Sequence, residues 1–346
     1  MYLITGSAGY VGSLLTRELI EKGEKVIAID NHELSVKSSN SIIQYLQDIT
    51  NPEKLEEIFK ENANIQCIFH CAAQLTFRKK SFDYFYKVNE EATQVLSDLA
   101  IKYKVQNFVY ISSNCVYGKV NQLNILENDP LKPFEEYGLS KLKSEQILMS
   151  KQKKINIVIL RPPTIIGEGR LGILSTVFDF IKENKKLWLV GSGLNRYQFV
   201  YGKDLVSACI KASKYKKSKI FNIGSDNIST LYDTFDYLIK KTNSKTKIFK
   251  LPTLIAIPLM KFFFKLGLSP LGPYQYNMIT NTYSGNTELL KKELNWMPTK
   301  SNNEILYSAY IYYINNYKSL HSNINNKDGN KHIGKEGIIK LIKWLS

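Results

Sequence analysis

Apolar runs of strand length alternate with longer amphipathic segments through the first half of the chain. Five runs of four to six residues are rich in Val, Ile and Leu: Tyr2–Thr5, Lys25–Asp30, Cys67–Cys71, Asn107–Ser112 and Asn156–Leu160. Helical spacing of apolar positions separates them: Val11–Lys22, Pro52–Asn62, Tyr84–Tyr103 and Tyr137–Lys151. Near-continuous apolar strands that alternate with helices indicate a parallel sheet covered on both faces. We therefore expect an α/β fold with a doubly wound parallel sheet.

The pattern changes after Arg161-Pro162-Pro163, where glycines separate shorter elements. Helices are expected there at four places: Ile173–Glu183, Asp204–Ser213, Tyr232–Lys241 and Asn303–Tyr317. We expect residues 1–165, with later returns to the sheet, to form the first domain, and residues 166–317 to form a smaller mixed α/β cap over the carboxyl edge. Open α/β sheets bind ligands at that edge. Residues 318–346 are expected to be a mobile linker followed by a short basic amphipathic helix at Ile338–Leu345.

Composition adds weak constraints on partners and location. The 47 Lys and Arg exceed the 31 Asp and Glu by 16, which favours anionic partners, although a Lys-, Asn- and Ile-rich genome would explain the same excess. The basic residues are spread along the chain without a recognition motif, so we expect no nucleic-acid partner. The four cysteines lack zinc-ligand spacing, and we expect no metal. Without a signal peptide or a membrane-spanning stretch, we expect a cytoplasmic protein. We also expect a homodimer.

A glycine-rich turn joins the first predicted strand to the first predicted helix. It reads Thr5-Gly6-Ser7-Ala8-Gly9-Tyr10-Val11-Gly12. Glycines at this spacing permit a tight turn, a close approach of the backbone to a pyrophosphate, and close packing of helix on strand. The N-terminus of the helix offers N–H groups and the positive end of its dipole to phosphates. In this strand–turn–helix context we predict a dinucleotide site at Gly6, Gly9, Tyr10, Val11 and Gly12.

An acidic residue ends the second predicted strand, 18 residues after Gly12. Asp30 is at the position where a carboxylate binds the hydroxyls of the adenosine ribose. The same carboxylate would repel the 2′-phosphate of NADP, and the following Asn31 and His32 supply no Arg to accept one. We therefore predict NAD as the cofactor, with Asp30 and Asn31 at its ribose.

Three further residues have the chemistry to move a proton. Tyr137 and Lys141 are four apart on a predicted helix and share one face. An ammonium and a nicotinamide cation nearby both favour the phenolate form of a tyrosine, which otherwise titrates near ~10. Ser113 stands where the fourth predicted run ends in a loop, 24 residues before Tyr137, and its hydroxyl suits a substrate oxygen.

These motifs together resemble the extended short-chain dehydrogenase/reductase family, of the NAD-dependent epimerase/dehydratase type, over residues 1 to 317. The matching segments are Thr5–Gly12, Asp48-Ile49, His70–Ala73, Ser112–Gly118, Tyr137–Lys141, Arg161-Pro162 and Glu293–Pro298. The resemblance implies a Rossmann-type fold and a catalytic set of Ser113, Tyr137 and Lys141. It also implies that the adenine lies against Asp48 and Ile49.

The resemblance assigns further cofactor contacts. Cys71, Ala72 and Ala73 would lie along the middle of NAD, and Lys141 would also hold the nicotinamide ribose. Asn89 matches a helix asparagine that organises the site in this family.

The substrate is less well specified by the sequence. The 4,6-dehydratases of the family carry an Asp-Glu pair after the catalytic hydroxyl, whereas this chain has Asn114 and Cys115, so a dehydratase is disfavoured. Thr164 and Arg196 are the candidate substrate contacts. Thr164 replaces a diphosphate-binding asparagine, and Arg196 is one place out of register with the clamp arginine.

We expect an NAD-dependent epimerase that acts on a nucleotide-sugar through a transient 4-keto intermediate. An alternative is an NAD(P)-dependent dehydrogenase or reductase of a sterol-like or other apolar substrate, and a second is a non-catalytic NAD-binding sensor. The apolar stretch Leu254–Leu268 fits the dehydrogenase reading if it lines a substrate pocket or makes peripheral contact with a membrane, and a buried cap helix would explain it equally well.

Overall fold

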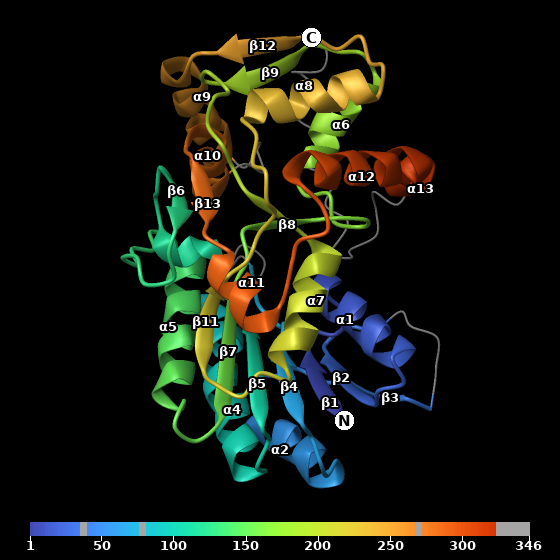
Figure 1. Cartoon of the computed structure of the whole chain (residues 1–346), viewed down its shortest axis with the longest axis vertical. Coiled ribbons are helices and arrows are strands. Elements are labelled where there is room, and N and C mark those ends of the chain that lie inside the picture. The colour runs from blue at the N-terminus through green and yellow to red at the C-terminus, as the bar shows by residue number, and fades with distance from the viewer. Residues whose placement is uncertain (35–39, 76–80, 267–271, 323–346) are drawn as a thin grey trace.

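The fold is built on a parallel sheet of seven strands, seen in a computed structural model that describes residues 1–34, 40–75, 81–266 and 272–322 (Figure 1). Across the sheet the strand order is β11-β7-β5-β4-β1-β2-β3, and every neighbouring pair is parallel. The strands are β1 (Tyr2–Thr5), β2 (Val26–Asp30), β3 (Ile42–Leu46), β4 (Cys67–His70), β5 (Asn107–Ile111), β7 (Asn156–Arg161) and β11 (Lys219–Asn222). The predicted doubly wound parallel sheet is confirmed.

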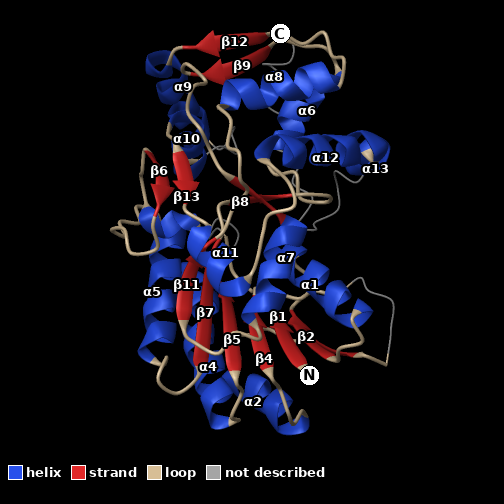
Figure 2. Cartoon of the chain, in the orientation of Figure 1, coloured by secondary structure: helices blue, strands red, loops and turns tan. Residues whose placement is uncertain are grey.

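Helices cover both faces of this sheet (Figure 2). One face carries α1 (Tyr10–Glu21), α7 (Gly202–Ala212) and α11 (Glu288–Leu294), which share a hydrophobic core with the strands. The other face carries α2 (Pro52–Glu61), α4 (Ala92–Lys102) and α5 (Glu136–Ser150), which share a second core. The strands are buried on both sides, which explains their nearly continuous apolar sequences.

The predicted helix over Tyr84–Tyr103 is interrupted by a wider turn. The structure has α3 (Phe82–Tyr86), a π-helical turn η1 (Lys87–Glu91) and then α4. Single π-helical turns inside α-helices are rare and occur often at functional sites. This one contains Asn89, whose side chain is buried.

The remaining elements form a cap with its own hydrophobic core above the carboxyl edge of the sheet. Its strands form three parallel pairs: β6 (Gln122–Ile125) with β13 (Tyr283–Gly285), β8 (Thr164–Ile166) with β10 (Phe199–Tyr201), and β9 (Leu187–Val190) with β12 (Ile248–Leu251). Its helices are α6 (Leu174–Lys182), α8 (Leu231–Lys241), α9 (Thr253–Lys265), α10 (Pro273–Thr280), α12 (Asn302–Asn315) and α13 (Tyr317–Ser322). A 3₁₀ turn, η2 (Asn114–Tyr117), follows β5 and also contributes to the cap core.

The cap and the sheet domain exchange segments. The chain returns from the cap to the sheet at α7 and β11, while β6 comes from the first half of the sequence and pairs in the cap. Trp296, in the late signature, is fully buried and donates its indole N–H to the carbonyl of Asp204 in α7 at 3.0 Å. The chain therefore crosses between the sheet domain and the cap several times.

The structure also bears on the expectations for residues 318–346 and for the apolar stretch Leu254–Leu268. Helix α13 continues to Ser322, so the segment after residue 318 begins as a helix, while the helix predicted at Ile338–Leu345 lies outside the described residues. The apolar stretch forms α9, of which Ala256 alone is fully buried, so it is not a core helix of the cap. In the described ranges, no helix is long and apolar enough to cross a membrane.

Candidate functional site

The glycine-rich turn between β1 and α1 is packed too closely for side chains at two positions. Gly6 has a φ of +70°, and a Cβ added there would lie 2.6 Å from the backbone N of Ala72. A Cβ on Gly12 would lie 2.1 Å from the carbonyl oxygen of Gly6. Gly9 caps α1, so the N–H groups of Tyr10, Val11 and Gly12 fall in the first turn, where a helix offers no internal acceptors. The turn therefore has the form of an anion-binding helix start.

Asp30 lies beside this turn at the end of β2. Its carboxylate accepts the N–H of Ala8 at 2.9 Å and the N–H of His32 at 3.0 Å. Asn31 is exposed next to it, with its amide oxygen 2.6 Å from Nδ1 of His32. The carboxylate is thus fixed against the glycine-rich turn, and the structure brings the two predicted ribose contacts to the same edge.

The next predicted contacts follow β3 and β4 at the same edge of the sheet. Asp48 accepts the hydroxyl of Tyr84 at 2.7 Å, and Ile49 is buried. The segment Cys71–Ala73 continues from β4 beside β1, with the N–H of Cys71 bonded to the carbonyl of Thr5 at 3.1 Å. The carboxyl ends of β1, β2, β3 and β4 therefore collect all of the predicted cofactor residues on these strands.

Asn89 connects this edge to helix α5. Its amide oxygen accepts the N–H of Gln74 at 2.8 Å, and its amide nitrogen donates to the carbonyl of Gln74 at 3.0 Å and to Oγ of Ser140 at 3.1 Å. The carbonyl of Asn89 accepts the hydroxyl of Ser144 at 2.7 Å. The π-helical turn thus places one asparagine where it bonds both the loop after β4 and the helix that carries Tyr137 and Lys141.

Ser113 lies at the end of β5, where it caps the 3₁₀ turn η2. Its Oγ accepts the N–H of Cys115 at 3.2 Å and lies 3.4 Å from Oδ1 of Asn114. Helix α5 packs directly on this turn at Gly138, which has no side chain. A Cβ added to Gly138 would lie 2.7 Å from the carbonyl oxygen of Cys115, so a larger residue would not fit there. The turn that holds Ser113 and the first turn of α5 are therefore in contact.

Tyr137 and Lys141 lie one turn apart on α5. The ammonium of Lys141 donates to the carbonyl of Ile111 at 2.7 Å and lies 5.8 Å from the centre of the Tyr137 ring and 4.5 Å from that of Tyr110. No hydrogen bond joins the Tyr137 hydroxyl to another of the residues that the structure describes. Its phenol group is thus left available for a ligand.

Burial shifts the pKa of both groups toward their neutral forms. It lowers the pKa of Lys141 from 10.5 to about 7, against the opposing influence of Cys71 and Glu145. It raises the pKa of Tyr137 above its ordinary value of 10.0, and the nearby guanidinium of Arg170 acts in the opposite direction. Without a further positive charge, Tyr137 is therefore a phenol at neutral pH, and burial brings the pKa of Lys141 close to neutral pH.

Arg170 links the cap to the glycine-rich turn. Its guanidinium lies 5.7 Å from the centre of the Tyr10 ring. The hydroxyl of Tyr10 is buried without a hydrogen-bond partner among the described residues, and it occupies a slot between Gly167 and Gly202, where an added Cβ would approach it to 2.3 and 2.4 Å. The sequence analysis did not identify Arg170, although the glycines around it in Gly167-Glu168-Gly169-Arg170 marked the loop.

A cluster of neutral polar groups faces the site from the cap. The hydroxyls of Tyr197 and Tyr274 are 2.6 Å apart, Asn114 donates to Tyr197 at 3.2 Å, and Oγ1 of Thr164 lies 3.1 Å from the hydroxyl of Tyr274. Tyr197, Tyr274 and Asn114 line a small cavity beside Cys115. This cluster, here called the tyrosine cluster, contains the predicted contact Thr164.

The other predicted substrate contact lies apart from the tyrosine cluster. Arg196 is exposed, and its guanidinium donates to the carbonyl of Ile228 at 2.7 Å. Its neighbour Tyr197 takes the buried position instead. The sequence analysis missed Tyr197 and Tyr274, although the shifted register of Arg196 indicated that the adjacent residue occupies the usual place of the arginine.

Comparison with known proteins identifies the family. Residues 2–224 match the model of the family described as "NAD dependent epimerase/dehydratase family". The chain belongs to this family. The expected extended short-chain dehydrogenase/reductase type and its NAD dependence are thereby confirmed, and the chain is an NAD-dependent enzyme of this type.

Relatives match over most of the chain. An uncharacterized protein, y4nG, of Sinorhizobium fredii is 32% identical over 324 residues, which are 92% of this chain and 80% of that protein. A putative UDP-glucose 4-epimerase of Methanocaldococcus jannaschii is 31% identical over 251 residues, 69% of this chain and 81% of that protein. The fold is similar to that of a UDP-glucose 4-epimerase from Thermotoga maritima solved with UDP-glucose, with a TM-score of 0.74 and 24% identity over 91% of this chain and 99% of that one.

The residues of this family member fit NAD. The hydroxyl of Ser7, inside the glycine-rich turn, is buried and has no partner among the described residues, and the turn itself excludes side chains at Gly6 and Gly12. Asp30 stands at the strand end beside it, and Lys141 uses one of its three N–H groups on the carbonyl of Ile111. These groups are the donors and the acceptor that a pyrophosphate and two riboses require.

Proposed function

We propose that the chain is an epimerase that inverts a hydroxyl-bearing carbon of a nucleotide-sugar, without net consumption of NAD. The observation that carries this proposal is the contact between α5, with Tyr137 and Lys141, and the turn that holds Ser113, next to the glycine-rich turn. The glycine-rich turn, Asp30 and Lys141 would hold NAD, which would supply a reversible hydride acceptor for the substrate carbon. The chain's own residues would manage the proton and the oxygen.

Tyr137 would act as the base that removes the proton of the substrate hydroxyl. Its pKa is raised by burial, so it needs positive charge nearby before it can take this role. The guanidinium of Arg170 lowers this pKa, and Lys141, whose Nζ lies 5.8 Å from the centre of the ring, would add positive charge in its protonated form. Ser113 would donate a hydrogen bond to the same substrate oxygen as the C–H bond breaks and a ketone forms. Return of the proton from Tyr137 and of the hydride to the opposite face of the ketone would give the epimer.

The residues after Ser113 favour epimerisation over dehydration within the family. Elimination of water needs an acid and a base beside the catalytic hydroxyl. Asn114 carries an amide that does not titrate, and burial raises the pKa of the Cys115 thiol to about 12. Neither side chain can exchange a proton at neutral pH.

The tyrosine cluster favours a second candidate, a dehydrogenase or reductase of an apolar hydroxyl or ketone. Tyr197, Tyr274 and Thr164 are uncharged, and the predicted clamp Arg196 bonds elsewhere. A diphosphate would find hydroxyls but no arginine at this cluster. An apolar ring system with one oxygen would fit those groups as well.

Analysis of the small molecules that the purified chain carries tests the proposal. The protein is gently denatured, and the released molecules are identified by mass spectrometry. Tightly held NAD together with a nucleotide diphosphate sugar would support the epimerase. Protein that emerges empty, binds added NAD and converts an apolar ketone with net oxidation of NADH would support the second candidate.

A further inference from the structure

The outer face of α9 is apolar and exposed. Five large side chains of the helix and the residue that follows it are roughly half or more exposed: Leu254 (88%), Ile255 (53%), Leu259 (48%), Phe262 (56%) and Leu266 (55%). Successive residues of a helix are 100° apart, so these five fall within an arc of about 140°, which also includes Pro258. A helix on the surface of a cap normally presents polar side chains on this side. Among the residues that the structure describes, none covers this exposed apolar stripe, here called the α9 face.

The opposite side of α9 is fixed to the cap. Ala256 is buried, the ring of Phe264 packs edge-to-face on Tyr276 of α10, and the hydroxyl of Tyr276 donates to the carbonyl of Met260 at 3.0 Å. The helix is thus held in one rotation, with the α9 face outward. Its exposure follows from how it packs on α10.

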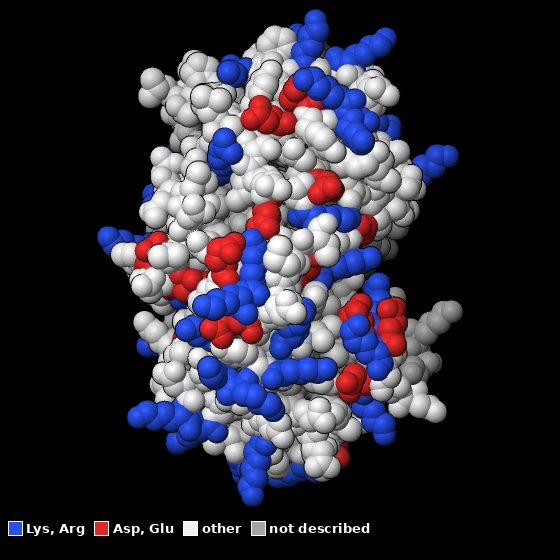
Figure 3. Space-filling view, in the orientation of Figure 1, with Lys and Arg blue, Asp and Glu red and all other residues white. Residues whose placement is uncertain are grey.

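The charged side chains of α9 all have one sign. Lys261 and Lys265 lie along one edge of the apolar stripe, since each is within about 20° of Leu254 on the helical wheel. From residue 237 to residue 287 the sequence contains seven lysines and neither Asp nor Glu. The view in Figure 3 shows a largely uncharged surface over α9, with basic side chains at the end of the cap and acidic ones over α8. An apolar stripe with a basic edge matches a surface that is apolar inside and negatively charged outside.

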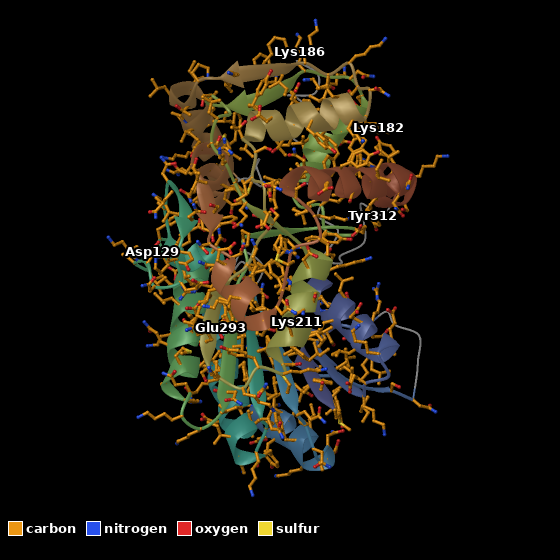
Figure 4. All side chains as sticks on the ribbon, in the orientation of Figure 1. Asp129, Lys182, Lys186, Lys211, Glu293 and Tyr312 are labelled. Atoms are coloured by element: carbon orange, nitrogen blue, oxygen red, sulfur yellow. The ribbon has the colours of Figure 1, made fainter. Side chains whose placement is uncertain are left out.

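The α9 face stands at the end of the molecule farthest from the sheet (Figure 1). Strand β12 leads into α9 through Pro252, and together with β9 it exposes Trp188 and Phe249, whose rings lie 5.1 Å apart. Figure 4 shows Lys186 projecting from this end. A flat surface can therefore approach α9 without meeting the sheet domain.

We propose that the α9 face is a membrane-docking surface that lies on an anionic lipid bilayer. Helices of this type bury their apolar side about 5–10 Å into the headgroup boundary, while lysines at the edge contact anionic headgroups. A second copy of the chain is disfavoured as the occupant, since a twofold contact would bring the same lysines and no acids together. Docking in this way would leave the sheet domain, with the glycine-rich turn, away from the lipid surface.

Co-sedimentation of the full chain with vesicles tests the proposal. The vesicles are pure phosphatidylcholine or equal parts of phosphatidylcholine and phosphatidylglycerol. The wild type should sediment with the anionic vesicles and at least tenfold more weakly with the neutral ones. The double variant Leu254→Gln/Phe262→Gln should lose this binding, and Lys261→Gln/Lys265→Gln should weaken it roughly fivefold for each lysine removed.

Matched variants at other surface positions distinguish binding through the α9 face from nonspecific hydrophobic or electrostatic binding. Ile43→Gln/Leu46→Gln removes two exposed apolar side chains from β3, and Lys153→Gln/Lys154→Gln removes two exposed lysines after α5. Both should bind vesicles like the wild type. Every variant should keep its melting temperature and its affinity for NAD, because the changed side chains are exposed.

Three results would overturn the proposal. The first is a wild-type chain that ignores anionic vesicles. The second is equal vesicle binding by the wild type and the α9 variants, which would assign binding to another segment, since those variants retain residues 323–346. The third is an α9 variant that halves the molar mass in light scattering while its vesicle binding is unchanged, which would make the face an interface between two copies.

Discussion

Arg161 and Glu145 form a two-point ion pair in the core beneath the candidate site. Nε and Nη2 of the guanidinium donate to the two carboxylate oxygens at 3.0 and 2.6 Å, and both side chains are almost completely buried. Glu145 lies one helical turn beyond Lys141, and it also accepts the hydroxyl of Ser112 at 2.5 Å. The pair therefore connects β7, helix α5 and the residue before Ser113.

Replacing only Glu145 should destabilise the fold strongly. In Glu145→Ala the guanidinium of Arg161 would be buried without its counter-ion, a change that costs about 3–5 kcal/mol of unfolding free energy. The double variant Glu145→Leu/Arg161→Met should recover much of that loss, because it leaves no unpaired charge. Chemical denaturation of the three proteins measures both values. A double variant less stable than Glu145→Ala would show that the charges are not the cause.

Tyr137→Phe should abolish turnover while NAD still binds. The variant removes one hydroxyl, for which no hydrogen bond to another described residue is present, so stability should change by less than about 1 kcal/mol. Loss of a general base lowers rates by about 10²–10⁴-fold. The rate of product formation in quenched assays measures turnover, and calorimetric titration with NAD measures cofactor affinity. Tyr103→Phe, on the far end of α4, is the control, and normal turnover by Tyr137→Phe would remove this residue from the mechanism.

Lys141→Met should give a more stable and inactive protein. The pKa of Lys141 is lowered from 10.5 to about 7, so the unfolded chain holds its proton over a range in which the folded chain has lost it. The cost to stability is therefore absent above about pH 10.5, grows as the pH falls, and is complete below about pH 7. The methionine should raise the free energy of unfolding by roughly 1 to 4 kcal/mol near neutral pH. Thermal melts from pH 6 to 10 should show a gain that shrinks as the pH rises, and a gain independent of pH would contradict this account.

Asp30 should select NAD over NADP. A fixed carboxylate at the adenosine ribose repels the 2′-phosphate, so the wild type should bind NAD at least about tenfold more tightly than NADP. Asp30→Ser should bring the two affinities closer together, mainly by weakening NAD. Fluorescence titration with each reduced cofactor provides the comparison, and Glu33→Ser is a nearby control. Equal binding of both cofactors by the wild type would refute the assignment.

Most of the sheet could be predicted from the sequence, and its edges could not. The runs that became β1, β2, β4, β5 and β7 are buried on both faces, so their apolar residues are nearly continuous. Strand β3 is an edge strand with exposed residues such as Leu46, and β11 contributes four residues at the opposite edge. Both edge strands are partly exposed, so they lack the continuous apolar pattern, and neither range was predicted.

The candidate site was predictable where it depends on spacing along one element. The turn at Gly6–Gly12 and the pair Tyr137 and Lys141 each belong to a local motif. The tyrosine cluster joins residues from four separate segments, so no local pattern could reveal it. The exposure of α9 could not be predicted either. An apolar composition fits a core helix and a docking helix equally well, and only the packing of the cap shows which side of α9 is covered.

Turnover at limiting NAD tests the central claim most directly. The chain is supplied with a nucleotide-sugar in large excess over NAD, and both the sugar and the reduced cofactor are followed by nuclear magnetic resonance. An epimerase that recycles its cofactor should form many molecules of epimer for each NAD, with no accumulation of NADH. Product that stops at one molecule for each NAD, matched by NADH, would contradict the proposed epimerase and identify a dehydrogenase.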